Sequence, residues 1–258
     1  MSTKDSVCFV SLGPGDPELL TMKGLKALEA ADLLFCPATA DRSRGRVSRA
    51  ADIVAALCRP GLTARLRLFG LPMSKDRRMA EAAYDGLCQE ILAQRALGKQ
   101  VAVVAEGDAG FYSSIQYVYD KLQAEGVAVE RIAGVPAFIA AAAVEGLAVA
   151  GQEERLLVVP GLITAEELVA HHQQGTVVVI MKLSQCAAEV RRCLRLHPEY
   201  AYHYFEQVGT AAEYVAHDAA LLLERPFPYF SLLIVAAGSQ TDSSTKGESV
   251  STVEACPY

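Results

Sequence analysis

Two glycine-containing segments carry the side chains that are best placed to do chemistry in this sequence. LGPGDPELLT (12–21) follows the apolar run VCFVS and contains Asp16, while EGDAGFYSS (106–114) follows VAVVA and contains Glu106 and Asp108. Ligands of open α/β sheets bind beyond the carboxyl ends of the strands, so both segments are expected at one rim of a sheet. Their carboxylates favour a cationic ligand, or one with amino groups, unless both segments are bare structural turns.

A phosphate site is the usual function of a glycine turn after a strand, but it fits the first segment poorly. The sequence has no GxxxxGK[ST] string, and the GxGxxG pattern that begins at Gly13 and Gly15 has Glu18 in place of its third glycine. Pro14 has no amide hydrogen to donate to a phosphate, and Asp16 would repel one. A nucleotide-dependent oxidoreductase is therefore disfavoured, and Asp16 is also expected to cap the helix that follows.

Positive charge gathers in two other segments. ADRSRGRVSRA (40–50) and LPMSKDRRMA (71–80) together contain seven basic residues, namely Arg42, Arg44, Arg46, Arg49, Lys75, Arg77 and Arg78. The whole chain has a formal net charge of −6 and a pI near 5.4, which argues against a nucleic-acid-binding protein. Local basic segments on an acidic chain suit a small polyanionic ligand, although a solvated charged loop would have the same composition.

Short apolar runs alternate with longer helical patterns along the first half of the chain. Strands are expected at 7–12, 32–37, 64–70, 101–107 and 127–132, and helices at 17–31, 48–57, 75–98 and 113–126. This alternation is typical of βαβ units, with a mostly parallel sheet covered by helices on both faces.

The pattern begins again after residues 133–136. Strands are expected at 155–161, 176–183, 201–207 and 229–238, with helices between them. We therefore expect two α/β domains, residues 1–133 and 134–240, each built of helix, mostly parallel sheet and helix layers. The polar stretch 241–258 lacks periodicity and is expected to be a flexible tail.

The composition bounds the cellular setting. The 258 residues are 52% apolar, yet no apolar run approaches the ~18 residues that a membrane span needs, and the N-terminus lacks signal-peptide architecture. Seven scattered cysteines without a CxxC pair indicate reduced thiols. The five histidines show neither HxH nor HxxxH spacing. We expect a cytoplasmic protein with no membrane contact and no metal of its own.

Several segments resemble, in order along residues 7–237, the motifs of the tetrapyrrole methyltransferases. They are GPGDPELLTMKGLKALEAADLLFCP, EGDAGFYSS, AGVPAFIAAAA, TVVVIMKLSQ and PYFSLLIV. This family methylates precorrins and uroporphyrinogen with S-adenosylmethionine as the cosubstrate. The resemblance implies two α/β domains with the active site in the cleft between them, a tetrapyrrole acceptor and a homodimer.

Other motifs narrow the resemblance within the family. EGD at 106–108, MK at 181–182, PMSKD at 72–76 and PYFSLLIV at 228–235 look like the branch that methylates carbon C-20 of precorrin-2 or cobalt-factor II. The alternatives are another ring position, or a relative of the same fold that methylates a protein or RNA. The sequence leaves open whether the acceptor is metal-free or contains cobalt.

The resemblance also implies which residues form the site. For the S-adenosylmethionine pocket they are Pro14, Glu106, Gly107, Asp108, Phe111, Pro136, Ala137, Met181 and Gly209. The acceptor carries carboxylates, which basic side chains can bind specifically; the candidates are Arg42, Arg44, Arg46, Arg49, Lys75 and Lys182. The methylated carbon must lose a proton, and Asp16 and Tyr112 are the candidate bases, with a helix cap and a core aromatic as the alternative roles.

Overall fold

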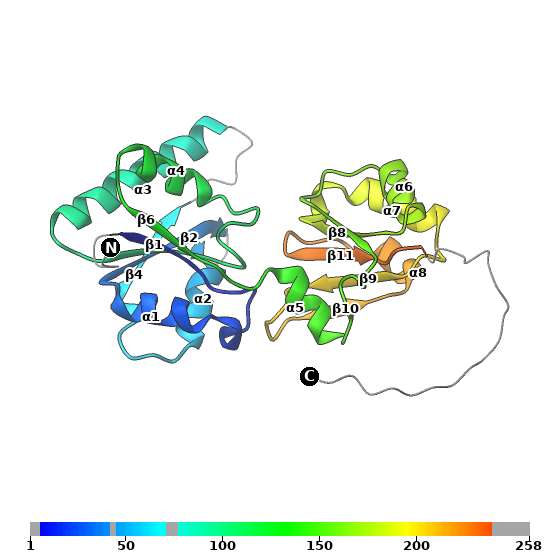
Figure 1. Cartoon of the computed structure of the whole chain (residues 1–258), viewed down its shortest axis with the longest axis horizontal. Coiled ribbons are helices and arrows are strands. Elements are labelled where there is room, and N and C mark those ends of the chain that lie inside the picture. Colours follow the sequence, from blue (N-terminus) through cyan, green and yellow to red (C-terminus); the bar gives the residue numbers. More distant parts are fainter. Residues whose placement is uncertain (1–5, 42–44, 71–76, 239–258) are drawn as a thin grey trace, which may run out of the picture.

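Two separate β-sheets, each between helices, form the structure (Figure 1). The computed structural model describes residues 6–41, 45–70 and 77–238. The predicted tail at 241–258 lies outside these residues. No helix in the described ranges is both long and apolar enough to cross a membrane.

The first sheet has six strands, in the order β3-β2-β5-β1-β6, with β4 paired to β2. The strands are β1 (Val7–Ser11), β2 (Leu33–Asp41), β3 (Gly45–Val47), β4 (Leu66–Gly70), β5 (Val101–Ala105) and β6 (Val129–Ile132). Every pair is parallel except β2–β3. The predicted mostly parallel sheet is confirmed here, and β5 is buried at all five positions because helices cover both faces.

Two helices cover each face of this sheet (Figure 1). On one face lie α1 (Met22–Ala30) and α2 (Arg49–Ala56), and on the other lie α3 (Arg77–Ala96) and α4 (Gln116–Ala124). The chain leaves β1 toward α1 but leaves the neighbouring strand β5 toward α4 on the opposite face. The carboxyl ends of β1 and β5 therefore flank a topological switch point, where open α/β sheets bind ligands.

The first helix differs from the prediction. A single helix over 17–31 is wrong, because the chain makes a short 3-10 helix at Pro17–Leu19, becomes extended at Leu20 and starts α1 only at Met22. Thr21 is the cause, since its hydroxyl accepts a hydrogen bond from the amide of Gly24 and so caps a new helix.

The second sheet has five strands, in the order β10-β9-β11-β8-β7. They are β7 (Arg155–Val159), β8 (Thr176–Met181), β9 (Tyr202–Glu206), β10 (Tyr214–Ala216) and β11 (Ser231–Val235). Only β7–β8 is a parallel pair, so this sheet differs from the mostly parallel one that was expected. The short connection from β9 to β10 cannot hold a crossover helix and forces an antiparallel pair.

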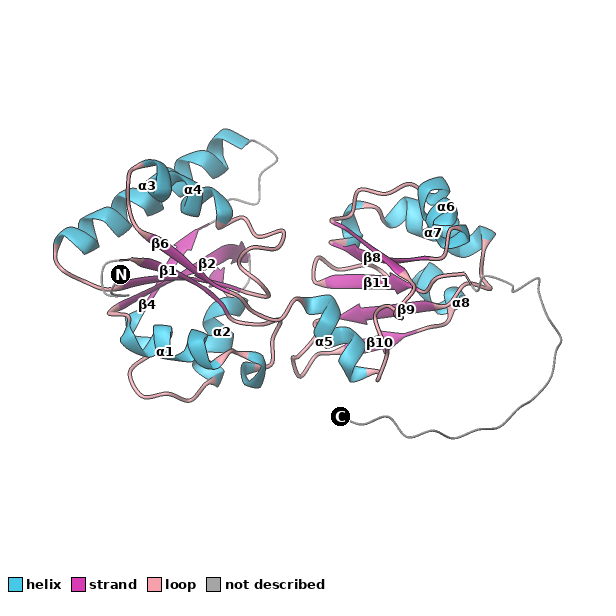
Figure 2. Cartoon of the chain, viewed as in Figure 1, coloured by secondary structure: helices cyan, strands magenta, loops and turns pink. Residues whose placement is uncertain are grey.

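Helices also cover both faces of the second sheet (Figure 2). Helix α5 (Ala137–Val144) lies on one face, and α6 (Ala165–Gln173), α7 (Ala187–Leu196) and α8 (Ala219–Glu224) lie on the other. Residues 133–136 connect β6 of the first sheet to α5, which packs against the second. The alanines of α5 are small enough to bring this helix close to β8 and β11, and its N-terminus faces the junction of the two sheets.

Candidate active site

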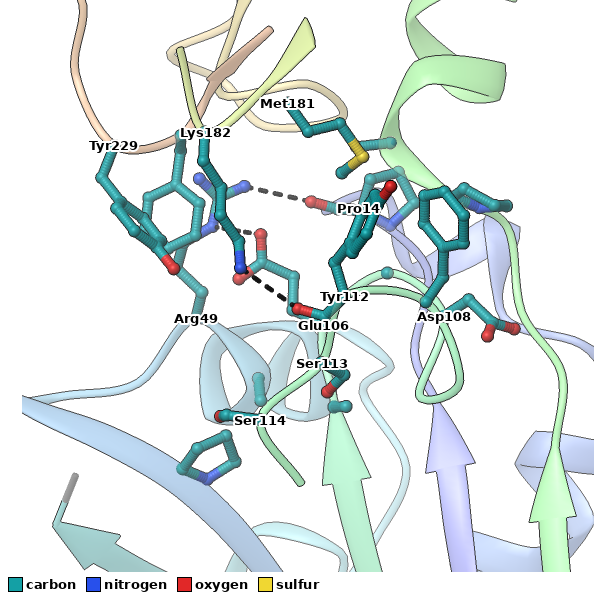
Figure 3. Close-up of a pocket in the computed structure, with 18 of the residues that line it drawn as sticks. Pro14, Arg49, Glu106, Asp108, Tyr112, Ser113, Ser114, Met181, Lys182 and Tyr229 are labelled. Carbon is teal, nitrogen blue, oxygen red and sulfur yellow. Dashed lines mark hydrogen bonds and ion pairs between the residues drawn. The ribbon is translucent and has the colours of Figure 1, made fainter. Parts of the chain in front are cut away.

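A cavity of about 310 Å³ lies where the carboxyl ends of β1 and β5 meet the ends of β8 and β11 (Figure 3). Eight of the nine residues predicted for the cosubstrate pocket line it: Pro14, Glu106, Gly107, Asp108, Phe111, Pro136, Ala137 and Met181. Of the other predicted site residues, Arg49, Tyr112 and Lys182 also line it. The cavity therefore brings residues from both sheets together at the topological switch point.

The two glycine turns are hydrogen-bonded to each other, as their expected position on one rim suggests. The amide of Gly13 donates to the carbonyl of Gly107 at 3.1 Å, and the amide of Gly107 donates to the carbonyl of Gly13 at 2.7 Å. Both residues have left-handed backbone angles, with φ of 80° and 69°, which glycine adopts without steric cost. These glycines turn the chain sharply after each strand, and Gly107 lines the cavity.

Gly15 and Gly209 allow the two halves of the chain to meet. A Cβ atom on Gly15 would lie 2.5 Å from the carbonyl oxygen of Val208, and one on Gly209 would lie 2.5 Å from the amide nitrogen of Asp16. Gly209 does not line the cavity, although its neighbour Val208 does. Gly15 and Gly209 therefore allow the β1 turn (12–21) to pack directly against the segment at 208–209.

The Asp108 carboxylate holds the second turn in place. It accepts hydrogen bonds from the amides of Gly110 at 2.8 Å and Gly134 at 2.7 Å. Ser11 joins the same network, since its hydroxyl donates to the carbonyl of Ile132 and accepts from the amide of Ala109. Figure 3 shows the Asp108 carboxylate directed away from the other labelled side chains. Asp108 is therefore part of the cavity wall, but its carboxylate oxygens accept hydrogen bonds from backbone amides.

The two predicted bases are both engaged in local hydrogen bonds. The Asp16 carboxylate accepts from the amide of Glu18 at 2.8 Å and caps the short 3-10 helix, and Asp16 does not line the cavity. The Tyr112 hydroxyl donates to the carbonyl of Val158 at 2.8 Å, which joins the first half of the chain to β7. Asp16 therefore has the helix-cap role that the sequence offered as its alternative, while Tyr112 lines the cavity with its hydroxyl hydrogen-bonded to β7.

Glu106 and Arg49 form an ion pair in the cavity wall (Figure 3), with 3.2 Å between Nε of Arg49 and Oε1 of Glu106. Arg49 also donates through Nη2 to the carbonyl of Pro14 at 3.0 Å, and its guanidinium lies 4.1 Å from the ring centre of Phe230. The remaining nitrogen, Nη1, is buried without a hydrogen-bond partner. Arg49 was predicted to bind substrate carboxylates; its Nε and Nη2 atoms contact the protein, while Nη1 has no partner there.

The pKa of Glu106 is raised to about 7, because burial disfavours its charged form more than Arg49 favours it. The Glu106 carboxyl therefore titrates near neutral pH, in the middle of the cavity wall.

Lys182 and an apolar wall complete the cavity on the side of the second sheet. Lys182 has a left-handed backbone, with φ of 55°, and its ammonium group donates to the carbonyl of Tyr112 at 3.3 Å. Phe111 packs against Phe138 of α5 with 5.9 Å between ring centres, and Phe111 and Met181 both line the cavity. A left-handed non-glycine residue stores backbone strain, which is typical of functional sites.

Sequence reasoning missed Tyr229 and Phe230, which line the cavity from the segment before β11. The string PYFSLLIV contained both, but they were not singled out as site residues. Arg42, Arg44 and Lys75 lie outside the described residues, and Arg46 belongs to β3 rather than to a loop. Within residues 6–41, 45–70 and 77–238, no group of three or more His, Cys, Asp or Glu side chains could hold a metal ion.

A family model and curated relatives all match this chain to tetrapyrrole methyltransferases. The family model described as "Tetrapyrrole (Corrin/Porphyrin) Methylases" matches residues 6–220. The chain is 32% identical over 235 residues to a precorrin-2 C(20)-methyltransferase of Sinorhizobium sp, covering 88% of this chain and 93% of that protein. It is 28% identical to the cobalt-precorrin-2 C(20)-methyltransferase of Salmonella typhimurium, covering 88% of this chain and 94% of that protein.

Solved structures share the fold. The uroporphyrin-III C-methyl transferase of Thermus thermophilus, in complex with S-adenyl homocysteine, superposes with a TM-score of 0.63 at 21% identity. The match covers 90% of this chain and 92% of that one. At this identity the likeness supports the fold alone, and it extends over both sheets.

Proposed function

The chain belongs to the tetrapyrrole (corrin/porphyrin) methylase family, and from this premise we propose that it methylates carbon C-20 of precorrin-2 or cobalt-precorrin-2. The methyl donor is S-adenosylmethionine, and the pathway is cobalamin biosynthesis. The single observation that carries the proposal is the match to C(20)-methyltransferases over 88% of the chain. The family model, which matches residues 6–220, includes both cavity-forming turns.

The cavity suits S-adenosylmethionine in its chemistry. Phe111, Pro136, Ala137 and Met181 form an apolar wall, and thioether and aromatic side chains pack well on a planar base. Glu106 supplies negative charge in the same cavity, which favours a ligand with a sulfonium and an amino group. We assign the cosubstrate site to the residues predicted for it, namely Pro14, Glu106, Gly107, Asp108, Phe111, Pro136, Ala137 and Met181, with Gly209 packed behind them.

The cosubstrate supplies an already activated methyl group, so the protein's main task is to hold donor and acceptor in line. Fixing two reactants at contact distance can contribute several kcal/mol to the rate. The cavity is built for this task, because both sheets contribute rigid strand ends to it and the turns are fixed by the Gly13–Gly107 and Asp108–Gly134 hydrogen bonds.

Acceptor binding is assigned to basic side chains. Lys182 is in the cavity wall, and we extend the assignment to the basic segments that contain Arg42, Arg44, Arg46 and Lys75. Arg–carboxylate contacts can be bidentate and therefore specific for the periphery of a polycarboxylate ring. We also propose that the enzyme is a cytoplasmic homodimer, as the family resemblance implies.

The direct test is turnover with defined acceptors. The purified protein is incubated with ¹³C-methyl-labelled S-adenosylmethionine and either precorrin-2 or cobalt-precorrin-2, and the product is analysed by NMR. We expect one new methyl resonance, on C-20, with at least one of the two acceptors. A methyl group on another ring position would move the protein to a different branch of the family. Tight binding of NAD with no binding of S-adenosylmethionine would overturn the assignment.

The acceptor site has its own test. Replacing Arg42, Arg44 and Arg46 together by Gln should raise the apparent Kd of the acceptor about tenfold or more and make it less sensitive to salt. Charged hydrogen bonds contribute about 1.5–3 kcal/mol each in a partly closed site and less when exposed. The matched control replaces Arg67, Arg192 and Arg195, which do not line the cavity. Equal effects of the two triple variants would show that only net charge matters.

A further inference from the structure

We propose that Glu106 accepts the proton that the acceptor carbon must lose after methylation. This inference rests on the proposed function and deepens it, since it names the base of that reaction. It stands on the position of the Glu106 carboxylate in the cavity wall and on the hydrogen bonds that occupy the other candidates.

Two carboxylate residues line the cavity in the described part of the chain, Glu106 and Asp108. Asp108 already accepts two backbone amides, so protonation there would cost the hydrogen bonds that fix the turn. Asp16 is outside the wall and caps a 3-10 helix, and the Tyr112 hydroxyl donates a hydrogen bond to the carbonyl of Val158. Among the three carboxylates considered, Glu106 is therefore the one whose partner is another side chain, Arg49, and not a backbone amide.

Glu106 is also held in a fixed orientation. It follows β5 directly, and its Oε1 atom is 3.2 Å from Nε of Arg49. Arg49 is itself fixed by the carbonyl of Pro14 and by the Phe230 ring. Arg49 is therefore a positioning residue for Glu106, because the ion pair holds the Oε1 atom of Glu106 in place.

The charge environment suits a proton acceptor that works near neutral pH. The charged and titratable groups that line the cavity with Glu106 are Arg49 from α2, Lys182 after β8, Tyr229 before β11, and Tyr112 and Asp108 of the same turn, with the Asp108 carboxylate directed away from Glu106. Burial raises the pKa of Glu106 to about 7, and Arg49 opposes the shift. General bases are most effective when their pKa lies near the working pH.

The step balances in atoms and charge. A bond forms between the methyl carbon and the acceptor carbon while the bond from methyl carbon to sulfur breaks, and the sulfur keeps that electron pair as a neutral thioether. The acceptor ring now carries the positive charge. The electrons of the C–H bond at the methylated carbon then return to the ring, and the proton goes to the Glu106 carboxylate, which becomes neutral.

The experiment is a pH profile of kcat/KM for the wild-type enzyme, Glu106→Gln and Glu106→Asp, with acceptor that is protonated or deuterated at C-20. We expect the wild-type rate to rise with pH through about 7 as Glu106 ionises. Glu106→Gln should lose this rise and about 100-fold or more of the rate, and its deuterium isotope effect should exceed that of the wild type. Glu106→Asp should restore part of the rate and the rise.

Arg49→Gln provides the second variant. Because Arg49 opposes the upward shift of the Glu106 pKa, its loss should move the rise in rate to higher pH. A purely structural ion pair would give similar losses in Glu106→Gln and Arg49→Gln, with the pH dependence unchanged, and would overturn the inference. If Glu106→Gln does not fold, a wild-type profile that is flat around pH 7 overturns it equally. Wild-type enzyme that methylates no tetrapyrrole would instead refute the proposed function.

Discussion

The β1 turn (12–21) and the β5 turn (106–114) lie side by side and look alike in sequence, yet their carboxylates serve different purposes. In the β1 turn the Asp16 carboxylate caps a 3-10 helix. In the β5 turn Asp108 takes the backbone amides, which leaves Glu106 to face the cavity with Arg49. Nearby amide groups therefore decide whether an acidic side chain becomes part of the scaffold or of the chemistry.

The largest expected effect concerns the glycines that differ between the two turns. Gly15→Ala in the β1 turn would place a Cβ 2.5 Å from the Val208 carbonyl, and we predict a loss of about 3 kcal/mol in the free energy of unfolding. Gly107→Ala in the β5 turn has open space around its Cβ but requires φ of 69°, which costs only about 1–2 kcal/mol.

Chemical denaturation measures both values. Gly86→Ala is the matched control, since its Cβ would meet nothing within 4 Å and alanine is the better helix former, so this variant should be more stable by about 1 kcal/mol. Equal losses for Gly15→Ala and Gly107→Ala would contradict the idea that the β1 turn is the tightly packed one.

The second prediction concerns pH and the stability of the β5 turn. Folded Glu106 keeps its proton up to about pH 7 and the unfolded residue only up to about 4.5, so protonation stabilises the fold fully below about 4.5 and this stabilisation is lost as pH rises through 7. Between these limits the wild type should lose about 3 kcal/mol relative to Glu106→Gln. Urea unfolding of both proteins at several pH values measures the difference, and parallel curves would show that Glu106 is well solvated.

The sequence predicted this rim more successfully than it predicted the roles of single residues. The strand-turn-helix pattern was enough to place 106–114 and 12–21 at one rim, and the family resemblance named part of the cavity wall. The sequence could not predict where each carboxylate points. Asp16 binds a backbone amide and Glu106 binds Arg49, and the groups within reach of each side chain depend on the folded structure. Thr21 decided where α1 begins through a single hydroxyl.

The second sheet was harder for a different reason. Its strands are apolar runs in the same style as those of the first sheet, and periodicity does not distinguish parallel from antiparallel neighbours. The antiparallel arrangement follows from the short β9–β10 connection and from the insertion of β11 between β8 and β9. That insertion is a long-range contact that local sequence does not reveal. Arg49 was read with a charged loop, while its place at the start of α2, beside Pro14 and Phe230, depends on tertiary packing.

A smaller effect is expected from the cap of the β1 turn. Asp16→Ala removes the acceptor of the Glu18 amide and should cost about 1 kcal/mol of unfolding free energy. Asp218→Ala is the control, because Asp218 caps α8 in the same way and does not line the cavity. The two losses, measured by thermal or urea unfolding, should be similar. A much larger loss at Asp16 would indicate an additional role for its carboxylate.

The smallest effect concerns Tyr112 at the end of the β5 turn. Tyr112→Phe removes one hydrogen bond to the Val158 carbonyl from a side chain that is 40% exposed, so we expect a loss of about 0.5 kcal/mol and methyl transfer within about threefold of the wild type. Tyr117→Phe on α4, at similar exposure and outside the cavity wall, is the control. A rate loss of about 100-fold in Tyr112→Phe would return Tyr112 to the role of base.

The measurement that tests the contrast between the turns most directly is the rate of methyl transfer in two amide variants, Asp16→Asn and Glu106→Gln, at about pH 8. Both substitutions remove a negative charge at nearly constant shape, and asparagine remains a good helix cap. We predict that Asp16→Asn keeps the wild-type rate within about threefold and that Glu106→Gln loses about 100-fold or more. A fast Glu106→Gln enzyme beside a slow Asp16→Asn enzyme would contradict the account.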